Sequence, residues 1–281
     1  MKNIAIFPNV EKDKDLKATE EVVSVIRGYG KTVLLDACFK GKTNCEAEFL
    51  PMNEIMKRAD LIVALGGDGT ILKIIKDAAE ASVPVMGINL GHLGFLTQAE
   101  KNDLSVFEKL FNGEYSISHN MMLEARIIRN GEVCEECLAL NDIILRGSAS
   151  KMISVGAEVN GTIANKYLAD GMIVATATGS TAYSLSCGGP IVSPDLDCII
   201  LTPICPHSLK TRCMVIPPDA EIKIRISPEY GNGAVLRADG SLIGNLECDD
   251  VLEVVSSTKR APLINLDGRN YFDVIRKKLS D

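Results

Sequence analysis

Residues 61–70 read LIVALGGDGT, a charge-free apolar run followed by a loop with three glycines and one carboxylate. An apolar run of this kind is typical of a strand buried on both faces of a parallel sheet. Beyond the loop, apolar residues recur at the spacing of one helix face, at Ile71, Leu72, Ile75, Ala78 and Ala79. The stretch therefore predicts a central strand, a glycine loop and an amphipathic helix.

Apolar runs and amphipathic segments alternate on both sides of this stretch. Strands are expected at residues 3–7, 32–35 and 83–90, and helices at 16–26, 53–58 and 102–111. Such alternation is typical of helices packed on both faces of a parallel sheet. We therefore predict an α/β fold class for the first part of the chain, a doubly wound, Rossmann-like domain over residues 1–100.

The pattern then changes to β-branched runs broken by turn residues. Three pairs in these turns are strong hairpin signals, namely Asn130-Gly131, Asn160-Gly161 and Asp239-Gly240. Residues 101–269 are therefore expected to form a mostly antiparallel, β-rich and β-sandwich-like domain.

The end of the chain, residues 270–281, reads as a helix. Its apolar side holds Phe272, Ile275 and Leu279, and an apolar helix side must pack against something. We expect this helix to return to the first domain.

Composition limits the class of protein. The 281 residues are 46% hydrophobic and carry a formal net charge of −7, which excludes a disordered chain. The acidic balance also speaks against nucleic acid or an anionic membrane as the main partner. No apolar run reaches the ~20 residues that a bilayer span requires. The nine cysteines are odd in number and irregularly spaced, so we expect reduced thiols and a cytoplasmic location.

The glycine loop combines groups that suit phosphate. Its members are Gly66, Gly67, Gly69 and Thr70, and its glycines let backbone N–H groups approach an anion at the positive end of a helix. Asp68 lies at the carboxyl end of a central strand, where open α/β sheets place their sites. It is therefore a candidate base that takes a proton from an attacking hydroxyl. The alternative is a plain strand-to-helix turn in which Asp68 caps the helix.

A second cluster spans residues 167–171 and 178–186 and is rich in small hydroxyl residues. Such residues can bind ribose and amide groups while leaving room for a ring. Its acidic residue, Asp170, can accept hydrogen bonds from hydroxyls or an amine. The alternative is a Ser/Thr-rich loop that caps a helix.

Other segments are weaker signals. The pair at 141–142 interrupts a strand run and could be a bulge, and His207 reads more often as a structural residue than as a catalyst. Residues 28–32 end like a Walker loop, but they follow a helix and the first glycine is missing. Cys134 and Cys137 have the spacing of metal ligands, but no second pair follows at a zinc-ribbon distance.

Taken in order, these clusters resemble the NAD kinase family over nearly the whole chain. The most discriminating ones are the 178–186 run, with Gly188-Gly189-Pro190 after it, and the 203–208 segment. The resemblance implies transfer of the γ-phosphoryl group of ATP to the 2′-hydroxyl of the adenosine ribose of NAD, giving NADP. It also implies a divalent metal, Mg²⁺ or Mn²⁺, and a site between an α/β and a β-rich domain. The expected assembly is a homodimer or homotetramer in which a neighbour helps to line the pocket, and polyphosphate stays open as an alternative donor.

The resemblance implies roles on the phosphate side of the site. Asp68 would be the base that activates the 2′-hydroxyl. Gly69 would lie against the nucleotide, and Lys73, one turn into the helix, would lie near phosphate.

It also implies positions that hold the dinucleotide. Asn141 and Asp142 would bind the adenosine side, and Asp170 would face the nicotinamide end. The remaining expected contacts are Thr181, Ala182, Tyr183, Ser184, Leu185, Ser186 and Lys151. The chain departs from the family pattern at Leu168, where relatives often carry a basic residue, and at Ser241, where some carry Gln.

Two other functions remain open from the sequence. The glycine-flanked aspartate also occurs in lipid kinases of the diacylglycerol type, which would need an apolar or basic membrane-facing surface. A non-catalytic NAD-binding protein would share the dinucleotide contacts but would not convert NAD to NADP.

Overall fold

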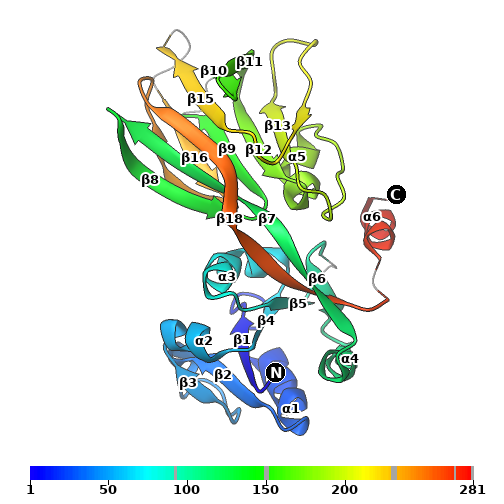
Figure 1. The fold of residues 1–281 in the computed structure, drawn as a ribbon. Helices are drawn as coiled ribbons and strands as arrows, with labels where there is room; N and C mark the ends of the chain where they lie inside the picture. Colours follow the sequence, from blue (N-terminus) through cyan, green and yellow to red (C-terminus); the bar gives the residue numbers. More distant parts are fainter. Residues whose placement is uncertain (92–93, 149–151, 229–232, 269, 280–281) are drawn as a thin grey trace. The chain divides into compact units, whose positions relative to one another are not determined.

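The computed structural model describes residues 1–91, 94–148, 152–228, 233–268 and 270–279. The chain forms two compact units (Figure 1): unit 1 is Met1–His119 with Ala261–Asp281, and unit 2 is Asn120–Arg260. Two long strands, β7 (Tyr115–Arg129) and β18 (Val251–Leu266), carry the chain from one unit into the other. It stays a prediction that residues 1–100 form the domain of the phosphate loop and that residues 101–269 form the domain that binds NAD.

Unit 1 is built on a parallel sheet with the strand order β6-β5-β4-β1-β2-β3. Its strands are β1 (Asn3–Pro8), β2 (Thr32–Asp36), β3 (Glu48–Leu50), β4 (Leu61–Gly66), β5 (Val85–Asn89) and β6 (Thr97–Glu100). All six residues of β4 are buried, as its charge-free sequence predicts. The short edge strands β3 and β6 are not apparent from the sequence pattern.

Helices cover both faces of this sheet, which confirms the doubly wound prediction. The helices are α1 (Lys17–Gly28), α2 (Met52–Arg58), α3 (Asp68–Ala81) and α4 (Val106–Asn112). In β5, Met86 and Ile88 share a core cluster with Val22 of α1. Side chains alternate along a strand, so Gly87 faces the other side, where Ile71 of α3 fills the space that a side chain would take.

The strand order reverses next to β1. The chain runs from β1 outward to β2 and β3, and then returns to place β4 and β5 on the other side of β1. Open α/β sheets bind ligands outside the carboxyl ends of the strands at such a reversal. Here those ends are the residues after Pro8 and Gly66.

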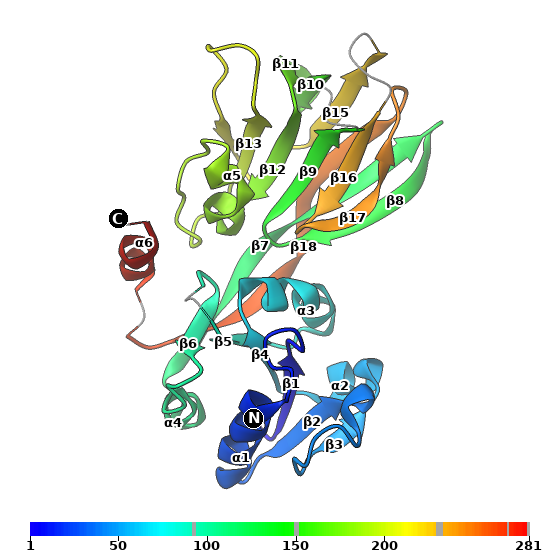
Figure 2. The same cartoon turned by 180° about the vertical axis from the view of Figure 1, so that it is seen from behind.

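Unit 2 contains two antiparallel sheets, with the strand orders β11-β10-β15-β18-β7-β8 and β14-β13-β12-β9-β16-β17. Figure 2 shows the second sheet from β13 to β17. The strands not yet located are β8 (Glu132–Ala139), β9 (Asp142–Gly147), β10 (Ile153–Val159), β11 (Thr162–Ala169), β12 (Gly171–Thr176), β13 (Ile199–Ile204), β14 (Met214–Ile216), β15 (Ile222–Ser227), β16 (Ala234–Ala238) and β17 (Ser241–Leu246). Val155 and Ile224 of the first sheet share one core with Leu145 and Val174 of the second, so the unit is a β-sandwich.

The outer face of the second sheet carries two short helical turns, η3 (Thr178–Thr181) and α5 (Tyr183–Ser186). Ile173 and Ala175 of β12 pack there against Tyr183. This places the hydroxyl-rich segment directly on the sheet.

The three predicted hairpins are present. Each turn pairs two residues at positive φ, as a tight hairpin turn of type I′ requires; they are Asn130-Gly131, Asn160-Gly161 and Asp239-Gly240. They join β7 to β8, β10 to β11 and β16 to β17.

The C-terminal helix α6 (Tyr271–Leu279) belongs to unit 1, but the predicted buried side is wrong. Phe272 is 68% exposed and Leu279 is 46% exposed, whereas Val274 is 4% exposed. The contact stripe runs through Tyr271, Val274 and Lys278, because Tyr271 and Lys278 both pack against the ring of Phe95. Spacing alone could not reveal this choice of face.

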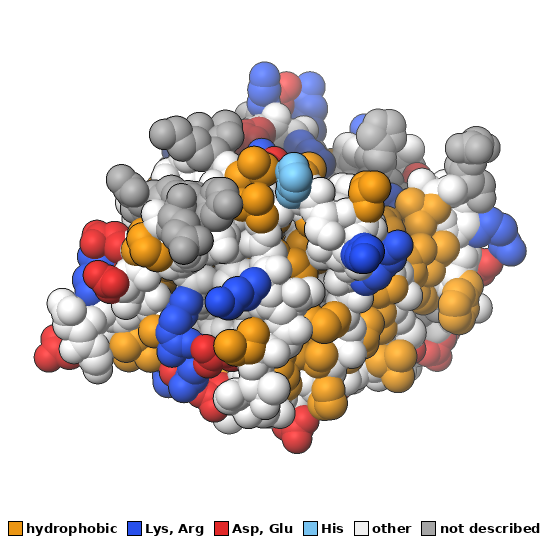
Figure 3. Space-filling view, turned by 90° about the horizontal axis from the view of Figure 1, so that it is seen from above, with side chains coloured by type: hydrophobic (Ala, Val, Ile, Leu, Met, Phe, Trp, Pro, Cys, Tyr) orange, Lys and Arg blue, Asp and Glu red, His pale blue; other side chains and the backbone are white. Residues whose placement is uncertain are grey.

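Three general properties accompany the fold. No helix in the part of the chain that the structure describes is long and apolar enough to cross a bilayer. All nine cysteines are free thiols. On the face seen in Figure 3, acidic and basic side chains stand in small separate groups among hydrophobic and uncharged ones.

Candidate functional site

Asp68 lies at the junction of strand β4 and helix α3, as the sequence predicts. It is the first residue of α3, and Gly67 precedes it as an N-cap without a side-chain hydrogen bond. The Asp68 carboxylate accepts the backbone N–H groups of Phe95, at 2.8 Å, and Leu96, at 3.0 Å. Asp68 is therefore bound to another loop and does not serve as the N-cap of the helix. Each carboxylate oxygen keeps lone-pair capacity for a further partner.

The glycine loop is shaped by close packing at one position and by open space at another. A β-carbon on Gly66 would overlap the Thr70 hydroxyl and would lie 2.7 Å from Cβ of Asn9. The side-chain amide of Asn9 donates to the Thr70 hydroxyl at 3.1 Å, which ties the loop after β1 to α3. Gly69 has no atom within 4 Å of a β-carbon, so the space beside it is open.

Lys73 lies on the exposed side of α3, one turn beyond Thr70. Both residues line a hollow of about 410 Å³ at the carboxyl ends of β1 and β2, together with Asn9 and Asp36. Lys73 is thus on the same helix as Asp68, beside a cavity that the loop after β1 also lines.

In unit 2, the Asn141-Asp142 pair is held from two sides. The Asp239 carboxylate accepts the backbone N–H groups of both residues, at 2.8 and 3.2 Å, and that of Leu140 at 2.8 Å. On the other side, the backbone N–H of Thr176 donates to the Asn141 carbonyl at 2.9 Å. The pair is therefore a fixed turn, and Asp239 is a residue that the sequence indicated only as part of a hairpin.

Asp142 is a buried acid, 3% exposed. Burial, followed by the nearby Asp239, raises the pKa of the Asp142 carboxyl from 3.8 to about 7. The group can therefore hold a proton near neutral pH and donate a hydrogen bond.

The hydroxyl-rich segment packs directly on this turn. A β-carbon on Gly179 would overlap the backbone of Asn141, and the Gly179 N–H donates to the Thr176 hydroxyl at 3.0 Å. The structure thus brings together two clusters that are far apart in the sequence.

Not every predicted contact residue of this segment has a side chain that could reach a ligand. Ser184 is fully buried, and its hydroxyl shares a hydrogen bond of 2.8 Å with that of Thr202. Thr181, Ala182, Tyr183 and Leu185 are partly exposed and Ser186 is exposed. Burial raises the pKa of the Tyr183 hydroxyl, which keeps it a donor at neutral pH.

Asp170 is not brought to the Asn141-Asp142 turn. It precedes β12 at the end where Gly147 donates to its carbonyl, whereas Asp142 pairs with Ala175 near the other end. Five residues at ~3.4 Å each separate Asp170 from Ala175 by roughly 17 Å. Lys151 lies outside the described residues.

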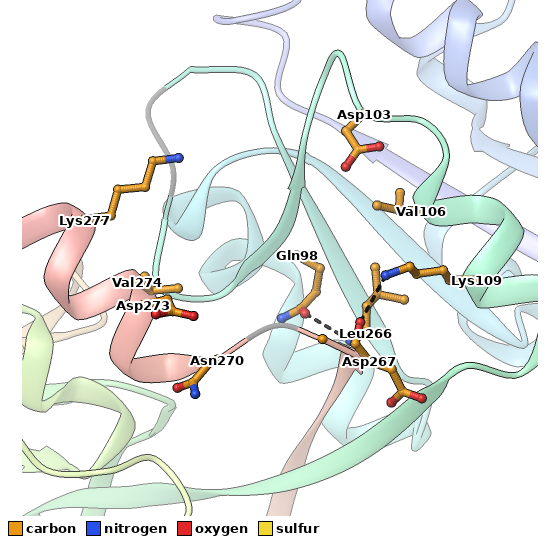
Figure 4. Close-up of a pocket in the computed structure, with 11 residues that line it drawn as sticks. Gln98, Asp103, Val106, Lys109, Leu266, Asp267, Asn270, Asp273, Val274 and Lys277 are labelled. Atoms are coloured by element: carbon orange, nitrogen blue, oxygen red, sulfur yellow. Dashed lines mark hydrogen bonds between the residues drawn. The ribbon is translucent and has the colours of Figure 1, made fainter.

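A second hollow, of about 310 Å³, lies beside α6 and is shown in Figure 4. Lys109 donates there to the Asp267 carbonyl at 3.2 Å, and Gln98 accepts the Leu266 N–H at 3.2 Å. None of the predicted site residues lines it.

The fold and the site define a class. A Gly-Gly-Asp-Gly loop follows a parallel strand in a doubly wound unit, and the same chain carries a β-sandwich. This combination is that of the two-domain kinases with a glycine-flanked aspartate.

The chain belongs to the ATP-NAD kinase family. Residues 6–115 match the ATP-NAD kinase N-terminal domain, and residues 140–266 match the ATP-NAD kinase C-terminal domain. The NAD kinase of Caldanaerobacter subterraneus subsp. tengcongensis is 41% identical over 283 residues, covering 100% of both chains. That of Symbiobacterium thermophilum is 39% identical, covering 100% of this chain and 99% of its own.

Solved structures show the same fold. The crystal structure of yeast NADH kinase complexed with NADH has a TM-score of 0.86 and 27% identity, covering 99% of this chain and 87% of that one. An NAD kinase from Archaeoglobus fulgidus in complex with ATP has a TM-score of 0.75 and 26% identity, covering 99% and 98%.

Proposed function

We propose that this NAD kinase transfers the γ-phosphoryl group of ATP to the 2′-hydroxyl of the adenosine ribose of NAD, with Asp68 as the general base. Family membership over the full chain supports the phosphorylation of NAD by ATP. The observation that carries the assignment of the base is the position of Asp68, between a buried central strand and the start of a 14-residue helix. The glycine-flanked aspartate alone would also suit a lipid kinase, but the family match extends through the β unit as well.

Catalysis by this arrangement depends on alignment and on one proton transfer. The N–H groups of Phe95 and Leu96 orient the Asp68 carboxylate, and its remaining lone pairs accept the proton of the attacking hydroxyl. Phosphoryl transfer through a loose transition state needs little further covalent help. Backbone N–H groups near Gly67 and Gly69 and the positive end of α3 face the phosphate oxygens in this proposal.

A divalent metal fits the donor set beside this loop. Among the described residues, no three His, Cys, Asp or Glu side chains gather to hold a metal. Mg²⁺ in kinases is usually bound by one or two carboxylates together with substrate phosphates, so a lone carboxylate beside a phosphate loop is sufficient. Asp68 is the residue that would hold the ion, which neutralises phosphate charge when bound.

The residues of unit 2 are proposed to hold the dinucleotide. The fixed turn at Asn141-Asp142 offers one amide and one acid that can be protonated at neutral pH, which suits hydroxyl and amine groups of adenosine. Thr181, Tyr183 and Ser186 add exposed or partly exposed hydroxyls from the segment after Gly179, which packs on this turn. Ser184 is left out of this set because its hydroxyl is buried and already bonded.

We also propose that Asp170 contacts the dinucleotide bound to a second copy of the chain. The roughly 17 Å of β12 between Asp170 and the partner of Asp142 separates the two acids within one chain. The protein would then be a homodimer or a larger homo-oligomer. Mixing Asp170→Ala with Asp68→Asn subunits should restore activity in the mixed oligomer, whereas each variant alone should be weak.

The free state of all nine cysteines supports a cytoplasmic location, because reduced thiols are kept by a reducing compartment.

The test of the base is Asp68→Asn, which keeps the size of the side chain. Wild-type protein with NAD and Mg-ATP should form NADP, detected with an NADP-specific dehydrogenase. The variant should keep its fold and much of its NAD binding but lose about 10²–10⁴-fold in kcat. Asp77→Asn, an exposed change on the same helix, is the control. Near-normal turnover of Asp68→Asn would refute the assignment, and a panel of NAD or NADH with ATP or polyphosphate defines the substrates.

A further inference from the structure

The helical turn η3 is held at three successive residues before the chain comes to the surface. Thr178, Gly179 and Ser180 are all buried. Thr181 is the first partly exposed residue after them. The contacts that the following residues are proposed to make with the dinucleotide therefore depend on how these three buried residues are held.

Two of the three residues are held by neighbours in the chain. The Gly179 N–H donates to the Thr176 hydroxyl at 3.0 Å, three positions away. The Ser180 hydroxyl donates to the Val192 carbonyl and accepts the Val192 N–H, both at 3.1 Å and twelve positions away. These bonds hold the turn to β12 and to the segment that follows α5.

The third residue, Thr178, is held by a distant strand. Asn120, in β7, donates from its side-chain Nδ2 to the Thr178 hydroxyl at 3.0 Å, across 58 positions of the sequence. Both side chains are buried, with Asn120 8% exposed and Thr178 7% exposed. Met121 and Leu123 face the core of the sandwich, so Asn120 lies on the other side of the strand. No sequence motif includes Asn120.

The bond from Asn120 reaches one of the proposed ligand contacts through a single residue. The Thr178 carbonyl accepts the Thr181 hydroxyl at 3.4 Å. The lone pairs of the Thr181 oxygen remain available to a donor group of a ligand. The position of this oxygen is therefore linked, through Thr178, to the side chain of Asn120.

We propose that Asn120 is a positioning residue for NAD, which holds the segment 181–186 in its binding conformation through Thr178. The inference rests on the proposed function of that segment and adds a residue that acts through another residue. Without the Asn120 amide, the Thr178 hydroxyl would be buried without this donor, which is costly. The turn can relieve this cost by moving, and the proposed contacts with NAD would then move with it.

Asn120→Leu removes the donor and keeps the approximate size of the side chain. The Kd for NAD is measured by calorimetry without ATP, and KM is measured for both substrates. Kd and KM for NAD should rise about tenfold, whereas KM for ATP should stay within about twofold. Asn165→Leu, the same change at an exposed position of unit 2, is the control. An unchanged Kd for NAD in Asn120→Leu would overturn the proposal.

A double-mutant cycle with Thr178→Val separates positioning from a contribution to folding alone. Val has the shape of Thr without the hydroxyl, so the double variant buries two apolar side chains in place of a hydrogen-bonded pair. Urea unfolding should show each single variant destabilised and the double variant partly restored. The Kd for NAD should stay about tenfold raised in all three variants, because all three lack the bond. A Kd that returns to the wild-type value in the double variant would overturn the proposal.

Thr178→Ser tests rescue, because it keeps the hydroxyl that accepts the bond. Its Kd for NAD should stay within about threefold of the wild-type value, well below that of Thr178→Val. If Asn120→Leu does not fold, the comparison of Thr178→Ser with Thr178→Val decides. Equal Kd values for these two variants would then refute the role of the bond.

Direct substitutions in the segment separate this inference from the proposed function. Tyr183→Ala and Thr181→Val each remove a hydroxyl that is proposed to contact NAD. Weaker NAD binding by these variants, with normal binding by Asn120→Leu, would refute the role of Asn120 alone. Normal binding by both, with weaker binding by Asn120→Leu, would refute the proposed side-chain contacts and leave the role of Asn120 standing, with the backbone of the segment as the binding element.

Discussion

Asp68 and Gly94 are in contact, and the Asp68 carboxylate occupies the space into which a β-carbon at position 94 would project. The two residues after Gly94, Phe95 and Leu96, donate the N–H groups that orient this carboxylate. The loop can reach Asp68 only while residue 94 has no side chain. Gly94 is therefore a positioning residue for the proposed base.

Gly94→Ala is expected to lower kcat by about 10²-fold, because a misplacement of roughly 1 Å at a reacting group costs about that much. KM for NAD and ATP should change far less. Gly28→Ala, at the end of α1, is a suitable control because its β-carbon meets nothing within 4 Å. Steady-state kinetics check the split, and a Gly94→Ala enzyme with normal kcat would contradict the role given to the loop.

The C-terminal helix α6 packs against the same loop at Phe95. Tyr271 lies 6.5 Å from the Phe95 ring, measured between centroids, and Lys278 Nζ lies 4.4 Å from that ring centre. Tyr271→Ala should therefore loosen Phe95 and lower kcat several-fold. Phe272→Ala, at the adjacent exposed residue, should not. Equal kcat values for the two variants would show that α6 has no part in orienting Asp68.

Much of the fold could be predicted from local patterns. The buried strand β4 and the hairpin at Asn160-Gly161 were predictable because burial and positive φ each demand particular residues. The buried face of α6 was not predictable, because the aromatic contact with Phe95 selects Val274 over Phe272. Tertiary contacts of this kind leave no periodic signal in the helix itself.

The candidate site shows the same division. The position of Asp68, between β4 and α3, was predictable because glycines surround it at the end of an apolar run. The support that Asp239 gives to the Asn141-Asp142 turn was not, because the residues it joins are 97 to 99 positions apart. Sequence motifs identify the groups that can do chemistry, whereas the residues that orient them come from distant loops.

Gly179 offers a test of the turn in unit 2. A β-carbon there would overlap the Asn141 backbone, so Gly179→Ala should displace the turn and weaken NAD binding more than it lowers kcat. Gly156→Ala, where a β-carbon lies 3.9 Å from the Arg225 carbonyl, is the control in the same unit. Calorimetric titration with NAD measures the effect, and unchanged affinity in Gly179→Ala would separate Asn141 from the dinucleotide.

Asp142 makes a prediction about stability and pH. Its pKa is about 7 in the folded protein, against a usual value of 3.8, because burial and Asp239 disfavour the charged form. Between these values the folded state binds more protons than the unfolded state. The contribution of Asp142 to the free energy of unfolding therefore falls as pH rises from about 4 to 7. Above pH 7 this contribution stays constant. The loss from this one group is roughly 4 kcal/mol.

Asp142→Asn removes the titration and keeps the shape of the side chain. Urea unfolding at pH 5, 6, 7 and 8 should show the variant gaining stability relative to wild type as pH rises, because only the wild type must bury a charge at pH 8. Asp249→Asn, an exposed change in the same unit, should follow the wild-type curve at every pH. If the difference between Asp142→Asn and wild type were the same at pH 5 and pH 8, Asp142 would not be titrating in this range. The acid would then meet the adenosine group as a charged acceptor, and the hydrogen-bond donor proposed for it would have to come from Asn141.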